Sequence, residues 1–182
     1  APTLPVTVRV EHAGQGQEAT LLGTYFAKRL PLGNEDFTTG ARTAYPWWRV
    51  SGDWPDDNSH NVLVGERLAR RLGVEPGNDV TLTGQTASTS RAKNAGEMGH
   101  ALRVSGILSA GGPEDDQIVA PLALAQQILG RPGAVRRVYV SALTKPEDAF
   151  GRRDPKSMTP AEFDRWFCTP YVSAIALQVE QA

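Results

Sequence analysis

The chain has 182 residues, of which 40% are apolar and 21% charged, and its formal net charge is −1 at pH 7. This length allows one domain or two small ones, and it can bury an ordinary core without disulfide or metal cross-links. A net charge so close to zero argues against nucleic acid as a partner, because phosphate binding requires a basic surface. No run approaches the roughly 20 apolar residues of a membrane-spanning helix. The single cysteine excludes an intramolecular disulfide.

The first part of the chain predicts strands. Residues 4–10 alternate apolar and polar side chains, which indicates a half-buried strand rather than the apolar block of a signal peptide. Residues 19–30 carry some apolar side chains at helical spacing, but their glycine, threonine and tyrosine favour a strand, which is what we expect. Residues 31–40 are expected to form a loop.

The middle of the chain predicts alternating strands and short helices. A buried strand at residues 61–64 precedes a helix at residues 66–72, and Gly73 is placed to end this helix in a left-handed conformation. The polar residues 85–99 predict a loop. Further elements are expected as strands at residues 80–83, 101–108, 117–120 and 135–143, and as a helix with Pro121 at its first position and Gly130 at its end.

The last part of the chain predicts helices. After a linker at residues 144–155, Thr159-Pro-Ala-Glu162 has the form of a capping box and starts a helix, and a second helical segment follows Pro170. The whole order is mostly strands, with two short helices in the middle and a longer one at the end. This order predicts an α+β fold.

Gly14-Gln-Gly-Gln-Glu-Ala19 fits the pattern of a dinucleotide-binding turn directly after a strand. Such a site requires a helix that begins here and offers its N-terminal amides to a pyrophosphate. The following residues do not predict a helix, so we interpret the segment as a flexible glycine turn. Paired acids such as Asp115 and Asp116, and the charged residues 66–71, are interpreted as solvated surface.

The sequence contains no recognisable catalytic motif. Its three histidines, His12, His60 and His100, lie in expected loops, and neither G-x-S-x-G nor H-E-x-x-H occurs. We therefore expect no enzymatic activity, no catalytic residue and no cofactor. Cys168 could hold a soft metal with Met98 and His100, but a lone cysteine beside aromatic residues is more typical of a small buried apolar group, so no metal site is expected.

Three of the four tryptophans, Trp47, Trp48 and Trp54, fall within one short segment. They could line a ligand or partner surface, since exposed aromatic residues mark interfaces. They could also anchor the core of a twisted sheet, which is the commoner use of such residues.

Several segments, taken in order, resemble one family. Residues 61–82 resemble the strand, short helix, Leu-Gly, turn and strand of MacB/FtsX/LolE-type ABC-transporter permeases, in their extracytoplasmic domain. Residues 48–54 resemble the aromatic lead-in to that block. Further resemblance lies in residues 102–108, 116–129 and 138–149, which are similar to its V-x-G-I strand, its strand-Pro-Leu-Ala-Gln helix and its closing V-x-V segment.

The resemblance implies a MacB-like periplasmic core domain of the α+β class, in which a mixed-sheet lobe is inserted into a smaller membrane-proximal α/β lobe. The inserted lobe would span residues 46–146, and residues 1–45 with 147–182 would form the membrane-proximal lobe, complete or not. No chemistry takes place in this domain of the family. A cytoplasmic ATPase drives the permease, a dimer, and the domain relays the motion to a cargo or periplasmic partner.

The expected location is therefore the periplasmic or extracytoplasmic side of a cytoplasmic (inner) membrane protein. Trp47, Trp48, Trp54 and the loop at residues 85–99 are the expected contacts with cargo or partner. The alternative is a free-standing extracytoplasmic protein that binds a metal ion or a small ligand. Apolar spans of about 20 residues on both sides would favour the permease, and a cleavable signal would favour the binding protein.

Overall fold

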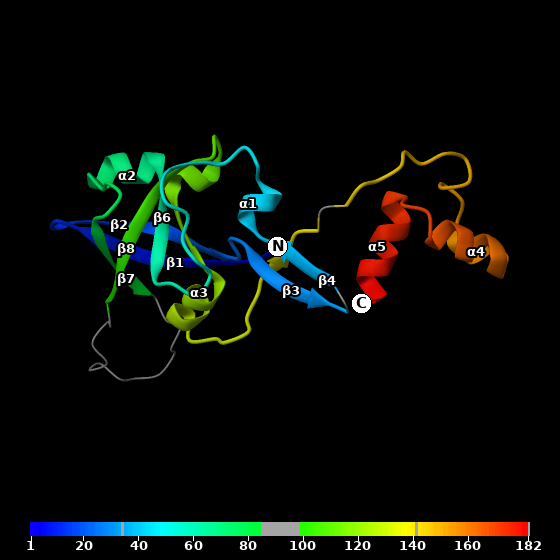
Figure 1. The fold of residues 1–182 in the computed structure, drawn as a ribbon, viewed down its shortest axis with the longest axis horizontal. Helices are drawn as coiled ribbons and strands as arrows, with labels where there is room; N and C mark the ends of the chain where they lie inside the picture. Colours follow the sequence, from blue (N-terminus) through cyan, green and yellow to red (C-terminus); the bar gives the residue numbers. More distant parts are fainter. Residues whose placement is uncertain (34, 85–98, 141, 182) are drawn as a thin grey trace. The chain divides into compact units, whose positions relative to one another are not determined.

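A computed structural model describes residues 1–33, 35–84, 99–140 and 142–181 (Figure 1). The chain forms two compact units, Ala1–Tyr139 and Val140–Ala182. The fold is sheet-dominated, with α and β elements mixed, as the predicted α+β class requires. The expected contact loop at residues 85–99 lies, except for Gly99, outside the described residues.

An eight-stranded sheet forms most of the first unit, and six of its strands close into a ring. The strand order is β10-β1-β2-β9-β6-β8-β5, and β7 pairs with both β1 and β8. The strands β1, β2, β9, β6, β8 and β7 therefore form a closed ring. The pairs β2–β9 and β6–β8 are parallel and the others antiparallel. These strands are β1 (Pro2–His12), β2 (Gln15–Thr24), β5 (Arg49–Gly52), β6 (Asn61–Gly65), β7 (Asp79–Gly84), β8 (His100–Ser109), β9 (Gln117–Pro121) and β10 (Arg137–Val138).

Two core clusters occupy opposite faces of the ring strands. On β6, Val62 and Val64 belong to the larger cluster, whereas Leu63 between them belongs to the smaller one, because successive side chains of a strand point to opposite faces. The larger cluster receives side chains from all six ring strands and from helices α2 (Glu66–Leu72) and α3 (Leu122–Leu129). The smaller cluster joins Phe26, Ala41 and Trp48 to the other face.

The middle segments agree with the sequence patterns. The helix α2 has the predicted bounds, and Gly73 ends it at φ 64° and ψ 36°, in the left-handed region. The helix α3 also ends at a left-handed glycine, Gly130, but Pro121 is its N-cap rather than its first helical residue. The prediction for Pro121 was therefore one position off.

The glycine turn at residue 14 joins β1 to β2 as a tight hairpin. Ala13 and Gly14 both have positive φ, 48° and 80°, as the two central residues of a primed hairpin turn require. Strand β2 then begins at Gln15, so no helix N-terminus follows the glycines. The interpretation of this motif as a turn, rather than as a dinucleotide site, is confirmed.

Residues 31–40 were expected to form a loop, and this was wrong for those that lie in strands. This part of the chain forms a separate two-stranded hairpin of β3 (Lys28–Leu32) and β4 (Glu35–Thr39), followed by the one-turn helix α1 (Ala41–Ala44). The proline and glycine residues of this hairpin are typical of loops, which is why its strands were not predicted. The carboxylate of Asp57 accepts the backbone N–H groups of Phe26 (2.6 Å) and Ala27 (2.9 Å), which fixes the chain before the hairpin.

The strand expected at residues 135–143 is much shorter, since β10 comprises only Arg137–Val138. The apolar side chains around it are exposed rather than packed: Val135 is 47% and Val138 64% exposed. The strand-like sequence of residues 135–143 therefore does not form a long strand, because its apolar side chains have no core to pack against.

The second unit is helical. It contains a short 3₁₀ turn, η2 (Pro155–Ser157), and the helices α4 (Pro160–Phe167) and α5 (Val172–Gln181), with a small core of Trp166, Tyr171 and Ala174. The capping box is confirmed: the Thr159 side chain accepts from the Glu162 N–H, and the Glu162 carboxylate accepts from the Thr159 N–H. Pro160 occupies the first turn, as predicted.

The expected lobes at residues 46–146 and at 1–45 with 147–182 stay a prediction. Strand β1 pairs with β7, and β2 pairs with β9, so the beginning of the chain shares one sheet with its middle. That residues at both ends of the chain lie near a membrane stays a prediction.

Candidate functional site

The candidate contact site is an aromatic surface between α1 and β5. Tyr45 caps the C-terminal end of α1, and its ring stacks on Trp48 at a centroid distance of 4.6 Å and meets Trp47 edge-on at 5.6 Å. Trp48 is 7% exposed and belongs to the core, whereas Trp47 is 61% exposed. The buried ring thus anchors Tyr45, which in turn supports the exposed Trp47.

Trp54 packs against the same core cluster but makes separate contacts. Its ring meets Phe26 edge-on at 6.0 Å, and the guanidinium of Arg42 lies 5.8 Å from its centroid. Trp54 is half-buried. Of the three tryptophans singled out in the sequence, only Trp47 therefore offers most of its side chain to a partner.

Tyr45 is the residue of this surface that the sequence analysis did not single out. Burial raises the pKa of its hydroxyl above the ordinary value, and the nearby groups of Tyr139 and Glu114 raise it further. The hydroxyl therefore stays protonated and can donate a hydrogen bond at physiological pH. The signal available in the sequence was its position two residues before Trp47.

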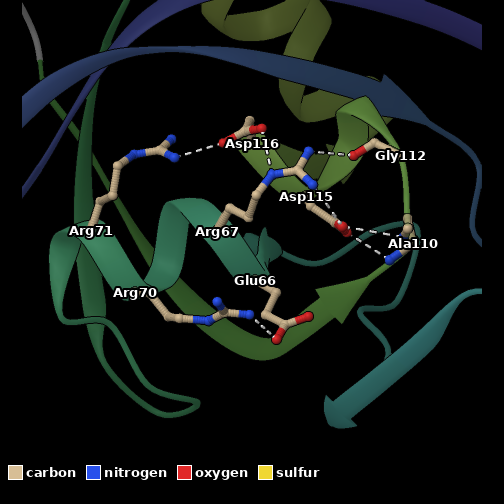
Figure 2. A network of polar contacts seen from close by, with 9 residues as sticks. Glu66, Arg67, Arg70, Arg71, Ala110, Gly112, Asp115 and Asp116 are labelled. Atoms are coloured by element: carbon tan, nitrogen blue, oxygen red, sulfur yellow. Dashed lines mark hydrogen bonds and ion pairs between the residues drawn. The ribbon is translucent and has the colours of Figure 1, made fainter.

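A network of charged groups holds α2 against the 3₁₀ turn η1 (Pro113–Asp116) (Figure 2). Arg67 Nε donates to Asp116 Oδ2 at 2.7 Å, and Arg71 donates to Asp116 Oδ1 at 2.6 Å. Arg67 also donates to the Gly112 carbonyl at 2.7 Å, and Arg70 pairs with Glu66 along the helix. Hydrogen bonds from Arg71 and then Arg67 lower the pKa of Asp116.

Asp115 closes this network from the inside. Its side chain is only 7% exposed, and its two carboxylate oxygens accept the N–H groups of Ala110 (2.6 Å) and Gly111 (3.2 Å). Arg67 lies 3.4 Å from Asp115 Oδ2. The interpretation of the acidic turn as solvated surface was wrong for Asp115, which is buried. Asp116 and the charged side chains of residues 66–71 are exposed, as expected, but Arg67 and Arg71 also join α2 to η1 through Asp116.

Of the candidate metal residues, His100 begins β8 in the first unit, Cys168 follows α4 in the second unit, and Met98 lies outside the described residues. Another histidine, His12, has its Nδ1 2.9 Å from the Asp79 carbonyl. Cys168 is exposed, so the interpretation as a buried apolar residue was wrong. Within the described ranges, no group of three or more His, Cys, Asp and Glu residues could hold a metal ion.

The second unit carries an open hollow of about 610 Å³ between its helices and the preceding loop. Three of its charged groups make contacts within the unit. Glu147 accepts the Ser173 N–H, the Arg152 guanidinium donates to the Glu147 carbonyl at 2.7 Å, and Arg153 donates to Glu162 at 2.7 Å.

Across the part of the chain that the structure describes, no helix combines the length and the apolar character needed to cross a bilayer. The sequence matches no family model and no curated protein. Among solved structures, the chain is similar to the extracellular domain of the noncanonical ABC-type transporter YknZ from Gram-positive bacteria, with 14% identity and a TM-score of 0.45. The alignment covers 71% of this chain and 57% of that one, so the chain spans less than two thirds of its length.

Proposed function

We propose that this chain is the extracytoplasmic domain of an ABC-transporter permease and relays ATP-driven motion to a cargo or partner outside the cytoplasmic membrane. The supporting observation is how the family-like sequence blocks map onto the fold. Residues 61–82 form β6, α2 and β7, residues 102–108 lie in β8, and residues 116–129 contain β9 and α3. The three blocks thus supply four of the six strands in the closed ring.

The ring of strands suits a domain that transmits motion. Each ring strand is paired on both sides, so a force applied to one strand is shared through backbone hydrogen bonds with its neighbours. The Arg67–Asp116 pair and the buried Asp115 also connect α2 to η1. Such a body moves as a unit, which is the property that a relay requires.

Trp47 is the contact that we assign to the cargo or partner, and the buried Trp48 supports it through Tyr45. The half-buried Trp54 packs against the same core cluster and is a secondary contact. A large exposed aromatic ring on a rigid base is typical of residues that dominate binding energy at an interface. The remaining partners of the proposal are a cytoplasmic ATPase subunit and a second permease copy, both reached through the membrane part of the full-length protein.

The test uses the full-length protein in lipid nanodiscs with the ATPase that is encoded beside it. We expect the two to copurify, and we expect Trp47→Ala to reduce transport-coupled ATP hydrolysis by about tenfold, as loss of an aromatic anchor at an interface would. Phe37→Ala is the matched control, because Phe37 is also an exposed aromatic residue, at 52%. Its ATP hydrolysis should equal that of the wild type.

Two outcomes contradict the proposal. One is a coding sequence in which a cleavable signal precedes the chain and a stop codon follows it, which indicates a free-standing binding protein. The other is a full-length protein that purifies without an ATPase and has no ATP-dependent function.

A further inference from the structure

The six-stranded ring leaves two outer strands, β10 and β5, each paired on one side only among the described residues. An unpaired strand edge presents backbone N–H and C=O groups that can bind another extended chain. The two edges differ in their side chains. In β5, Arg49, Ser51 and Gly52 are exposed. The one large apolar residue of this strand, Val50, is half-buried.

The edge at residues 135–139, called here the β10 edge, carries exposed apolar and basic side chains together. Val135, Val138 and Tyr139 are 47%, 64% and 48% exposed, which is unusual for a segment with a strand-forming sequence. Arg136 and Arg137 are also exposed, and no ion pair among the described residues includes either of them.

The backbone of the β10 edge is oriented for a further strand. The Tyr139 N–H donates to the Ala1 carbonyl at 2.9 Å, and the Ala1 nitrogen donates to the Tyr139 carbonyl, so both backbone groups of Tyr139 point toward β1. Alternate residues of an antiparallel strand direct these groups to opposite sides. The N–H and C=O of Val138 therefore point away from β1, toward the open edge.

The side chains of the β10 edge indicate whether it binds another strand or is protected against pairing with one. Proteins often place basic residues on an edge strand to prevent pairing, but such edges are then poor in exposed apolar groups. Here the two arginines are adjacent in the sequence and lie between large exposed apolar side chains, so in an extended conformation each face of the segment carries one arginine and an exposed apolar side chain. The combination is complementary to an extended segment that carries acidic and apolar residues on both of its faces.

We infer that the β10 edge binds an acidic, extended peptide segment of a partner protein by strand addition. The Val138 backbone pairs with the incoming strand, the exposed valines pack against its apolar residues, and Arg136 and Arg137 bind its carboxylates. This inference concerns the backbone edge of β10 rather than the Trp47 ring, and it holds whether or not the chain belongs to a transporter.

The probe is a capped nine-residue peptide with the repeat Val-Val-Glu-Glu, which places valine and glutamate on both faces of a strand. It is added to the ¹⁵N-labelled 182-residue chain, and a peptide with lysine in place of glutamate is the control. The glutamate peptide should shift the NMR signals of residues 135–139 and slow hydrogen exchange at the Val138 amide. The β5 edge, around residues 49–52, should be unaffected.

Two variants separate strand addition from simple charge attraction. Val138→Pro removes the outward N–H and should abolish binding, while Val138→Thr keeps the N–H and should retain it. The double change Arg136→Glu and Arg137→Glu should weaken the glutamate peptide about tenfold and make the lysine peptide the better ligand. Unchanged β1 and β2 amide signals verify that each variant folds.

Four results would overturn the inference: equal binding of both peptides, signal shifts confined to other regions, protection of the Val138 amide by self-association of the free chain, and displacement of the peptide by vesicles of phosphatidylglycerol. The third would assign the edge to a second copy of the chain, and the fourth to an anionic lipid surface.

Discussion

The two compact units of the chain are stabilised by different kinds of contact. In Ala1–Tyr139 a closed ring of strands pairs the backbone and surrounds a large apolar cluster. In Val140–Ala182 three residues form the buried core, and side-chain hydrogen bonds to the backbone hold the loops. Asp148 is the centre of this second arrangement.

The Asp148 carboxylate accepts the Phe150 and Gly151 N–H groups at 3.0 and 2.9 Å. It also accepts the Tyr171 hydroxyl at 2.9 Å and lies 3.1 Å from Lys145 Nζ. The Gly151 N–H, then Tyr171 and Lys145, lower the pKa of Asp148 strongly. A unit too short to bury much apolar surface thus relies on a few polar groups, and it should respond differently to mutation and to pH.

The largest effect is expected from Trp166→Ala. Trp166 is 1% exposed, and its indole N–H donates to the Gly151 carbonyl at 3.0 Å. Its loss should lower the free energy of unfolding of the second unit by about 4 kcal/mol and leave much of that unit unfolded. Loss of NMR dispersion for residues 142–181 would verify this. If the second unit stays folded in this variant, its stability does not depend on the small core around Trp166.

The next effect is expected in the first unit, from Leu68→Ala. Leu68 is fully buried on α2 and belongs to the cluster inside the ring. The cavity should lower the free energy of unfolding by about 3 kcal/mol, measured by urea denaturation, without preventing folding, because many other side chains share the core. Arg70→Ala on the same helix is the control, since its side chain is 69% exposed and should change stability little. Equal losses in the two variants would contradict the assignment of the core.

Acid should weaken the second unit, because its small core leaves it dependent on carboxylate hydrogen bonds. The pKa of Glu162 is lowered to about 2 from 4.5, mainly by its hydrogen bond from Arg153 and then by those from Thr159, and the pKa of Asp148 is lowered as well. A carboxyl group with a lowered folded-state pKa stabilises the fold above its unfolded pKa, and this stability is lost as the pH falls from about 4.5 toward 2.

Thermal unfolding followed at the second unit should therefore show a falling midpoint over this range. Asp148→Asn should lower the midpoint at pH 7 and flatten its pH dependence. A midpoint in the wild type that is constant down to pH 2 would show that neither carboxylate stabilises the unit.

The smallest effect is expected from Thr159→Ala. This change removes the side chain that accepts the Glu162 N–H at the start of α4, and loss of such a cap costs about 1 kcal/mol. Thr169→Ala is a matched control outside the capping box, because its hydroxyl donates only to the Arg165 carbonyl at the other end of α4. A loss for Thr159→Ala no greater than that for Thr169→Ala would show that the capping box contributes nothing.

The sequence predicted the elements that have strong local signals. The α2 helix ends at Gly73, which adopts the left-handed backbone conformation that glycine tolerates best. The capping box at Thr159 fixes the start of α4. The sequence did not predict the closed ring of strands. The pairings β1–β7 and β2–β9 join residues far apart in the chain, and no local pattern encodes them.

The missed elements have a common physical origin. The β3–β4 hairpin contains Pro31 and turns at Gly33, at φ 62°, so its turn residues resemble a loop. The β10 pattern predicted a long strand, but a partner strand is present for only two of its residues. At the candidate site, the clustering of tryptophans predicted a contact segment, which stays a prediction, whereas which ring is exposed depends on how Tyr45 packs against Trp48.

The most direct test of the central claim uses Cys168, which is the single cysteine of the chain and is exposed. Intact cells that produce the full-length protein are treated with a membrane-impermeant maleimide, with the Cys168→Ser variant as control. We expect Cys168 to react before the cytoplasmic membrane is broken, because an extracytoplasmic domain faces the reagent. Reaction only after that membrane is lysed would place the domain in the cytoplasm and contradict the account.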